Sequence, residues 1–189
     1  MFGRGLALGC LGVALLAGSL GAQTEEPTRD WSEARFDARF DGMAWLIGEW
    51  QGYGEFSDRT TYIHKRYSYE VAGVYLVEKT LDIFPPPEVS TEFEVHQDFS
   101  VFYRENQTGD FSANGFFVET FVTGASVTLL DGGESFVVES NSVHNGPPGM
   151  RTRMTYTRSG PDEFQLLFEI GPPGQEHRTT EKSRFRRIR

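Results

Sequence analysis

Short β-rich runs separated by turn residues fill the chain from Trp50 onward, and this alternation limits its possible folds more than any other feature. The breaks include Asp131-Gly132-Gly133, in which Gly and Asp tolerate positive φ, and Gly160-Pro161, in which Pro presets φ at about −65°. Short strands joined by hairpin-length turns are typical of an antiparallel meander. We expect strands at residues 50–56, 60–69, 73–83, 91–104, 110–120, 125–130, 135–140, 150–158, 163–170 and 179–188.

Apolar and polar side chains alternate most clearly between residues 93 and 104, where Phe99 and Tyr103 share one face and His96 and Asp98 share the other. One face of each strand is therefore expected to be buried while the other contacts water. An open meander of this length would leave two unpaired edges, which closure into a barrel removes. We predict an all-β fold, an up-and-down antiparallel barrel of about ten strands, over a sandwich, which usually needs longer crossovers.

One helix is expected before the strands. Phe36, Phe40, Met43 and Ile47 recur at spacings of four, three and four, which is the apolar stripe of an amphipathic helix. Gly48 then supplies a helix stop. We expect this N-terminal helix to cover one end of the barrel.

The first 22 residues have the pattern of a secretory signal peptide. Arg4 gives a basic start, Leu6–Leu20 is apolar, and the small residues up to Ala22 supply a cleavage point. The apolar run is short for a hydrocarbon core of about 30 Å, so a membrane anchor is the less favoured reading. Residues 23–30 are polar and aperiodic, which predicts a flexible leader and leaves residues 31–189 as one barrel domain. The mature protein is expected to be periplasmic or extracellular, without a membrane span.

Cysteine content and net charge exclude several classes of function. The single cysteine, Cys10, lies in the predicted signal peptide, so the mature chain would have neither a disulfide nor thiol chemistry. The formal net charge of −9 argues against nucleic acid or an anionic membrane as the main partner. Nothing in the composition fixes the oligomeric state.

The run Trp45–Gly54 combines the end of the expected helix, the Gly48-x-Trp50 pair and a first strand punctuated by glycines. It resembles the opening of the calycin superfamily, which includes the lipocalins, the fatty-acid-binding proteins and the nitrobindin-like barrels. With Gly73–Leu76 and a basic last strand, the chain also resembles an uncharacterised secreted bacterial family of lipocalin-like barrels, over about residues 36–188.

In calycins, the tryptophan of this pair closes the barrel floor, and an arginine from the last strand packs across its face. The resemblance therefore implies a structural latch between Trp50 and Arg184 or Arg186. These two arginines are two residues apart and share a strand face, whereas Arg187 is expected to point the other way.

The nitrobindin-like branch binds haem through a histidine near the start of the last strand. His177 lies just before that strand, but counting back from Phe185–Ile188 places the matching position nearer Thr180. A shift of three residues turns the side chain to the other face, so no haem is expected. The four histidines are scattered without ligand spacing, so we expect neither a metal nor another cofactor.

Aromatic residues make up 14% of the chain, and several fall on faces that we assign to the interior. They form either a packed core or the wall of a ligand cavity. Tyr62, His64 and Arg66 share one face of the second strand, and Ile63, Lys65 and Tyr67 share the other, so neither face is wholly apolar, which favours a partly polar lumen. The candidate lumen residues are Trp50, Phe99, Tyr103, Phe117, Met154, Tyr156 and Phe168.

Three functions follow from this prediction. The first is a binding module, an exported barrel that holds a small, largely apolar or amphipathic ligand in its lumen. This function requires no catalytic residue, and none is predicted. The second is an enzyme of isomerase or cyclase type with an ionisable group in the lumen, for which Glu78, Arg66 and Glu119 are candidates. The third is a structural or interaction barrel with a filled lumen. An inward charge pair beside a cavity would favour the enzyme, and a solid lumen the third function.

Overall fold

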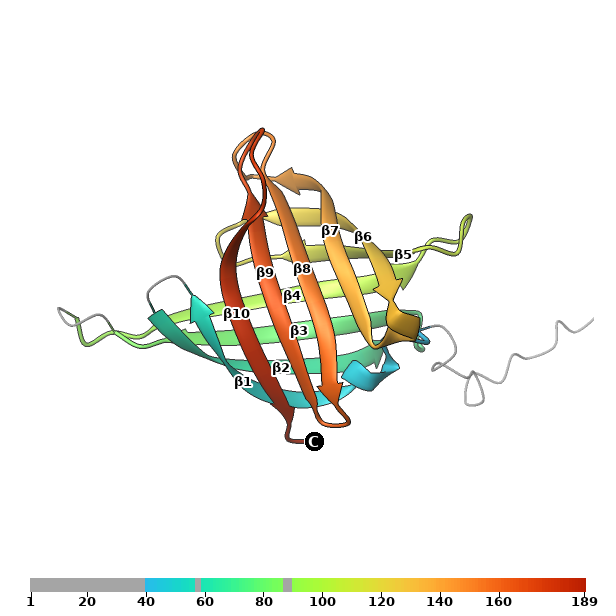
Figure 1. The fold of residues 1–189 in the computed structure, drawn as a ribbon, viewed down its shortest axis with the longest axis horizontal. Helices are drawn as coiled ribbons and strands as arrows, with labels where there is room; N and C mark the ends of the chain where they lie inside the picture. The colour runs from blue at the N-terminus through green and yellow to red at the C-terminus, as the bar shows by residue number, and fades with distance from the viewer. Residues whose placement is uncertain (1–39, 57–58, 87–89) are drawn as a thin grey trace, which may run out of the picture. The chain divides into compact units, whose positions relative to one another are not determined.

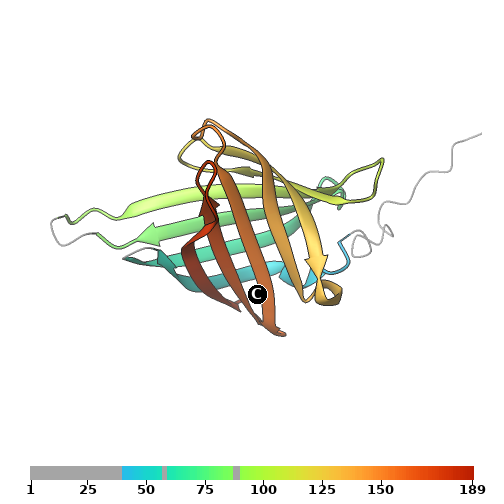
Figure 2. The ribbon, with the colours of Figure 1, turned by 45° about the horizontal axis from the view of Figure 1, so that its top comes forward.

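The computed structural model describes residues 40–56, 59–86 and 90–189. Ten antiparallel strands in these residues form a closed barrel, seen from two directions in Figure 1 and Figure 2. Each strand pairs with its neighbours in sequence, and the last strand closes the ring on the first. The strands are β1 (Gly48–Phe56), β2 (Arg59–Glu70), β3 (Tyr75–Phe84), β4 (Glu94–Arg104), β5 (Phe111–Phe116), β6 (Val122–Leu130), β7 (Ser135–His144), β8 (Arg151–Gly160), β9 (Glu163–Gly171) and β10 (Arg178–Arg187). The predicted all-β, up-and-down barrel is confirmed, and each expected run matches one strand to within a few residues.

Glycine in β1 allows the last strand to approach the first. Gly52 lies opposite Phe185 in the β1–β10 register. A Cβ atom at Gly52 would collide with the carbonyl oxygen of Arg184 and with the ring of Phe185. The glycine punctuation of the first strand is therefore required for barrel closure, where two backbones come close together.

The chain before β1 contains a short 3₁₀ helix, η2 (Ala44–Leu46), in place of the predicted α-helix. Gly42 adopts a φ of 90°, which no residue of an α-helix has. The prediction of a helix over residues 36–47 is therefore wrong for its described part, and residues 36–39 lie outside the described residues. The backbone turns more tightly here, with three residues per 3₁₀ turn.

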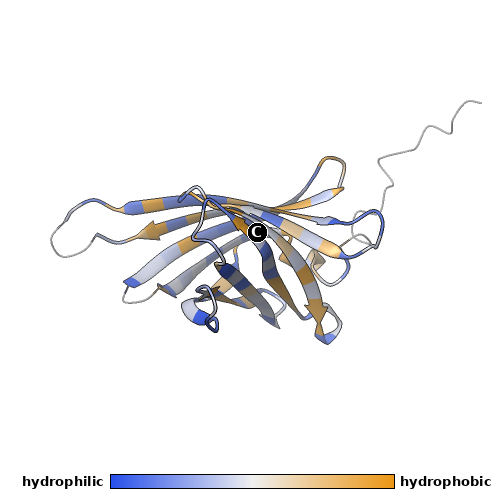
Figure 3. Ribbon diagram, turned by 90° about the horizontal axis from the view of Figure 1, so that it is seen from above, coloured by the Kyte–Doolittle hydropathy of each residue, from blue (hydrophilic) through white to orange (hydrophobic). Residues whose placement is uncertain are grey.

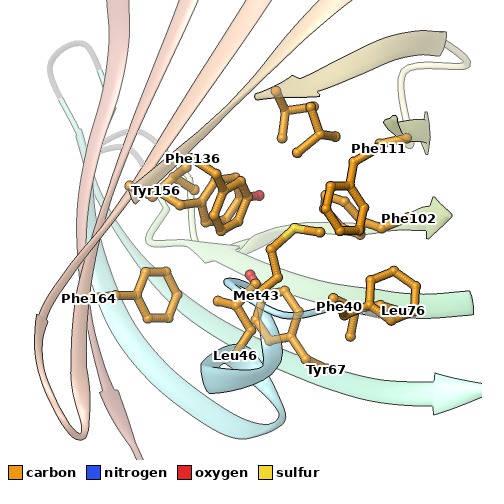
Figure 4. Packing of buried hydrophobic residues seen from close by; sticks show 14 of the residues in the cluster. Phe40, Met43, Leu46, Tyr67, Leu76, Phe102, Phe111, Phe136, Tyr156 and Phe164 are labelled. Carbon is orange, nitrogen blue, oxygen red and sulfur yellow. The ribbon is translucent and has the colours of Figure 1, made fainter. Parts of the chain in front are cut away.

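The predicted position of this segment at one end of the barrel is nevertheless correct. Phe40, Met43 and Leu46 recur every three residues and are fully buried. Figure 4 shows Met43 reaching in among the labelled rings with its methyl end toward Phe111, and Leu46 on the side of Phe164. The segment from Phe40 to Leu46 is called the plug below, because it fills the end at which β1 begins.

Other predictions for the N-terminal part of the chain also concern residues outside the described ones. The predicted signal peptide, residues 1–22, and the predicted leader, residues 23–30, fall in this group, so export stays a prediction. Between Phe40 and Arg189, the residues described contain no helix long and apolar enough to cross a membrane.

Strand β4 presents its polar face to the lumen, opposite to the predicted orientation. Figure 3 shows hydrophobic and hydrophilic residues alternating along the strands, as expected for a barrel wall. In β4, however, His96 and Asp98 face inward, while Phe99 is 43% exposed and stacks on Phe116 outside, with ring centroids 4.6 Å apart. Tyr103 shares this outer face with Phe99. The placement of Phe99 and Tyr103 in the lumen was therefore wrong.

The barrel interior has a packed half and a hollow half. Around the plug, stacked rings fill the lumen, with Phe136 on Tyr156 at 4.4 Å and Phe164 on Phe185 at 4.5 Å between ring centroids. Several of these rings, contributed by β7, β8 and β9, are seen in Figure 4. The opposite half, where β1 ends and β2 begins, contains the cavity that forms the candidate site.

Candidate functional site

A cavity of about 300 Å³ occupies the hollow half of the barrel. This volume lies at the lower end of the range for small-molecule sites. The cavity reaches solvent, because Glu119 lines it and has a side chain that is 46% exposed. Its floor lies against the packed rings, where Lys65 and Glu78 are its most deeply buried charged side chains.

The cavity has an apolar wall and a polar wall. Strands β8 and β9 and the turn after β5 supply the apolar wall, which consists of Phe117, Phe121, Met150, Met154, Leu166, Phe168 and Ile170. Strands β2, β3 and β4 supply the polar wall, which consists of Lys65, Glu78, Thr80, Asp82, His96, Asp98 and Ser100 and also includes the apolar side chains of Ile63 and Phe84. Because the two walls face one lumen, the cavity suits a molecule with one apolar and one polar side.

A buried ion pair forms the polar floor. The Lys65 Nζ donates to Glu78 Oε1 at 2.6 Å and to Thr80 Oγ1 at 2.9 Å. The Tyr156 hydroxyl donates to Glu78 Oε2 at 3.0 Å. Burial opposes charge on both partners, but their mutual attraction and hydrogen bonds lower the pKa of Glu78 and raise the pKa of Lys65. Both side chains are therefore charged at neutral pH.

Asp82 lies beside this pair in a different electrostatic state. Burial raises the pKa of its carboxyl to about 7, and the nearby carboxylates of Glu181 and Asp98 add to this rise, while Lys65 opposes it. Its Oδ1 atom is buried and has no hydrogen-bond partner among the described residues. Asp82 is thus an acceptor that the barrel itself leaves unsatisfied.

Further carboxylates lie around the cavity on the side away from the Lys65–Glu78 floor. Asp98 accepts the Val118 backbone N–H at 2.8 Å, and burial raises the pKa of its carboxyl. The ring nitrogens of His96 lie 2.8 Å from Glu94 Oε1 and 3.2 Å from Glu119 Oε1. Acidic groups therefore outnumber basic groups around the lumen.

The structure brings three of the predicted lumen residues to the cavity and leaves the others elsewhere. Phe117, Met154 and Phe168 line it. Tyr156 is buried beneath the floor and contacts the cavity through Glu78. Trp50 is fully buried in the packed half, edge-on to Phe164. Whether these residues bind a ligand stays a prediction.

The latch of Trp50 is made by Arg187, so the choice of Arg184 or Arg186 was wrong. Trp50 and Arg187 are directly opposite in the β1–β10 register, and the guanidinium carbon lies 4.1 Å from the centroid of the indole ring. Arg187 also donates to the carbonyl oxygens of Trp45 and Ile47. Arg184 is exposed, and Arg186 forms an exposed ion pair with Glu163. Directly paired residues share a face, which explains the difference.

Sequence reasoning found part of the polar wall. Of the ionisable candidates, Glu78 and Glu119 line the cavity, whereas Arg66 is exposed outside the barrel. The sequence did not identify Lys65, Asp82 or Asp98 as ionisable residues of the lumen. For Lys65 a signal was present, because it shares a strand face with Ile63 and Tyr67, both of which are buried.

The histidines and carboxylates of the described residues bear on metal and haem ligation. No group of three or more metal-ligating side chains occurs in the described part of the chain. His96 is the one histidine among the described residues that lines the cavity, and carboxylates lie close to both of its ring nitrogens. His177 lies apart from the cavity, in a surface depression with Arg151 and Gln175. The absence of haem stays a prediction.

Comparisons with known proteins identify the fold alone. No family model matches the sequence, and no curated protein matches it. Two solved structures that resemble the barrel are Rv2717c from M. tuberculosis, with a TM-score of 0.57 and 12% identity over 80% of this chain and 98% of that one, and the S-type phycobiliprotein lyase CPES from Guillardia theta, with a TM-score of 0.50 and 10% identity over 77% of this chain and 89% of that one. At such identities the likeness carries no activity across. The chain is a ten-stranded, closed antiparallel barrel of calycin-like fold.

Proposed function

We propose that this barrel binds a small, largely apolar or amphipathic molecule in its cavity. The observation that carries the proposal is the division of one cavity into an apolar wall and a polar wall. The apolar wall gains free energy by removing ligand surface from water, at roughly 25 cal/mol per Å². The polar wall orients the ligand through a few fixed groups.

The floor of the cavity supports binding over a purely structural role. Thr80 and Tyr156 both hydrogen-bond to the Lys65–Glu78 pair, so its geometry is fixed before any ligand arrives. Such preorganisation reduces the ordering cost of binding. A structural barrel with a filled lumen would not need a cavity of about 300 Å³ lined by charged groups.

Mass spectrometry under native conditions, on protein purified from its own host, tests the proposal. We expect the wild-type protein to carry a bound small molecule. Ser100 lines the cavity, so Ser100→Phe should fill it and lower ligand occupancy at least about tenfold, which corresponds to about 1.4 kcal/mol. The matched control is Ser126→Phe, because Ser126 is exposed on β6.

Two results would contradict binding in the cavity. One is wild-type protein that carries no small molecule from any growth condition. The other is a ligand that Ser100→Phe retains at wild-type occupancy while the thermal unfolding of the variant remains cooperative. Loss of the ligand from Ser126→Phe as well would show that the effect is not specific to the lumen.

A proton-transfer enzyme of isomerase type is the second candidate, and one observation favours it. An inward charge pair, Lys65–Glu78, stands beside the cavity with Asp82, whose raised pKa of about 7 suits a general base at neutral pH. We rank it second because Lys65 and Glu78 hold each other in their charged forms. Binding needs only the two walls, whereas catalysis needs Asp82 to exchange a proton with the substrate.

Turnover distinguishes the two functions. The molecule released from the native complex is incubated with fresh protein and followed by chromatography for a product of the same mass. If the barrel is an isomerase, wild-type protein converts the molecule, and Asp82→Asn at saturating concentrations of the molecule slows conversion by at least about a hundredfold. No conversion over hours by wild-type protein would exclude this candidate for that molecule.

A further inference from the structure

We propose that the cavity is specific for amphipathic amines, with a ligand ammonium group held by Asp82 and the neighbouring carboxylates and an apolar body held by the opposite wall. The inference rests on the proposed binding function and names the chemical class of its ligand. It is carried by three observations on the cavity, which concern its charge, its unsatisfied acceptor and its aromatic lining.

The ionisable side chains that line the cavity are mostly acidic. Its carboxylates come from three strands and one turn, and they are Glu78, Asp82, Asp98, Glu119 and Glu181. The basic groups of the lining are Lys65 and His96, and the Lys65 charge is already matched by Glu78 at 2.6 Å. Because Glu78, Asp82 and Asp98 are at least partly buried, the local dielectric is lower than in bulk water, and the remaining negative charge attracts a cation more strongly there. The same charge repels a carboxylate or phosphate ligand.

Asp82 supplies a specific place for the ammonium. Its buried Oδ1 has no partner in the described residues, and leaving a buried acceptor unpaired costs about 1–3 kcal/mol. An ammonium has three N–H donors and no acceptor. One donor can satisfy Asp82 while the others face the carboxylates of Asp98 or Glu181, both of which act electrostatically on Asp82.

The free-energy cost of ionising Asp82 also favours a positively charged ligand. Folding raises its pKa from 3.8 to about 7, so the ionised carboxylate lowers stability as pH rises between these values. A bound cation offsets this cost, whereas a neutral ligand leaves it in place. The site is therefore built to gain from positive charge in the ligand.

Aromatic rings border the acidic groups. Phe56 and Phe84 line the cavity and lie edge to face at 5.6 Å, and Phe84 lies 5.0 Å from the ring of His96, which is next to Asp82 across the β3–β4 ladder. A cation over an aromatic face gains roughly 0.5–2 kcal/mol, and the Arg59 guanidinium already lies 4.8 Å from the Phe84 centroid, so this ring takes up a cation in the fold itself. Carboxylates alone would also suit a hydrated metal ion, whereas rings beside carboxylates suit an organic ammonium.

Isothermal titration calorimetry with three probes of equal chain length tests the inference on the wild-type protein. The probes are octylamine, octanol and octanoate, which share an eight-carbon chain and differ in their polar end. We expect octylamine to bind at least about tenfold more tightly than octanol, and octanoate more weakly than both. Measurements at two salt concentrations should show the amine preference shrinking as salt rises.

Two variants assign the preference to residues. Asp82→Asn keeps the shape of the side chain and removes its charge, and it should reduce the affinity for octylamine about tenfold while leaving octanol unchanged. Asp98→Asn gives the same direction and guards against a folding defect in the first variant. Asp110→Asn, on the exposed turn before β5, is the matched control and should have no effect.

The pH dependence gives an independent measurement. An alkyl amine stays protonated up to about pH 10, as lysine does. Affinity for octylamine should therefore rise about tenfold from pH 6 to pH 8 as Asp82 ionises. The groups acting on Asp82 are Lys65 on β2, His96 and Asp98 on β4 and Glu181 on β10. Asp82→Asn isolates its own contribution, and the slope should flatten in that variant.

The outcomes separate the inference from the proposed function. If octanol or octanoate binds as tightly as octylamine, the barrel binds amphipathic molecules and only the amine specificity is wrong. If Asp82→Asn and Asp98→Asn both fold and keep the full amine preference, the assigned carboxylates are wrong and the inference fails. If none of the three probes binds and the protein from its host carries no ligand, the proposed function falls together with the inference.

Discussion

Replacing Arg187 with methionine is expected to lower the free energy of unfolding by about 2–4 kcal/mol, because several interactions end together. The guanidinium stacks on the Trp50 indole at 4.1 Å and donates to Trp45 O at 2.6 Å and to the Ile47 carbonyl. A hydrogen bond contributes about 0.5–1.5 kcal/mol net, and one from a charged donor up to about 3 kcal/mol. Urea denaturation followed by tryptophan fluorescence or circular dichroism measures the change.

Arg186→Met is the matched control, since the two residues are adjacent in β10. Arg186 pairs with Glu163 at the surface, and its side chain is 74% exposed. An exposed ion pair contributes at most about 1 kcal/mol. A control variant as unstable as Arg187→Met would show that β10 tolerates no substitution and would remove the evidence for a latch.

A double-mutant cycle with Trp50→Phe separates the stacking contact from the other bonds of Arg187. The indole also donates through Nε1 to the Leu46 carbonyl at 2.6 Å, so Trp50→Phe alone should cost several kcal/mol. The coupling energy with Arg187→Met should be roughly 0.5–2 kcal/mol, the range of a cation–π contact. Zero coupling would mean that the two residues stabilise the plug end independently.

The barrel itself was predictable because its strand pairing is local. Each strand pairs with the next one along the chain, and the turns that join them carry residues with special φ preferences, such as Gly132, with φ of 68°, and Asn145, with φ of 60°. Closure then follows from the cost of leaving two edges unpaired. Among the described strands, only β1 and β10 pair over a long sequence separation.

The inward face of β4 was not predictable from alternation. A period of two shows that Phe99 and Asp98 point to opposite sides but not which side is the lumen. The usual assumption that the apolar side is inside fails where the lumen is half hollow and partly polar. Asp98 lines the cavity while Phe99 packs on Phe116 outside.

The ion pair and the latch depend on which residues lie opposite each other in neighbouring strands. The sequence predicted the strands but not this register. The β2–β3 hairpin pairs Lys65 with Thr80 and Tyr67 with Glu78, which brings Lys65 diagonally against Glu78. The latch depends in the same way on the pairing of Trp50 with Arg187, set by barrel closure. A one-residue difference in either register would turn these side chains to the other face.

Breaking the Lys65–Glu78 pair is expected to have the second large effect. Lys65→Met or Glu78→Leu should each lower the free energy of unfolding by about 3–5 kcal/mol, because each leaves one charge buried without its partner. Both side chains are only 6% exposed. Arg59→Met, which breaks the more exposed Arg59–Glu94 pair, is the control and should cost at most about 1 kcal/mol.

The double variant Lys65→Met/Glu78→Leu should recover most of the stability lost in either single variant. It buries no charge and replaces the pair with apolar side chains of similar size. Tyr156 then loses its acceptor on Glu78, so recovery should fall short of the wild type by about 1–2 kcal/mol. A double variant less stable than both single variants would show that each side chain acts through other contacts.

The pH dependence of unfolding completes this test. The pKa of Glu78 is lowered from 4.5, so its contribution is fully present above pH 4.5 and is lost as pH falls through its folded pKa. The pKa of Lys65 is raised from 10.5, so its contribution is fully present below pH 10.5 and is lost as pH rises through its folded pKa. Wild-type stability should therefore fall more steeply than that of the double variant at both extremes. Parallel curves for the two proteins would mean that neither group gains stability from its charged partner.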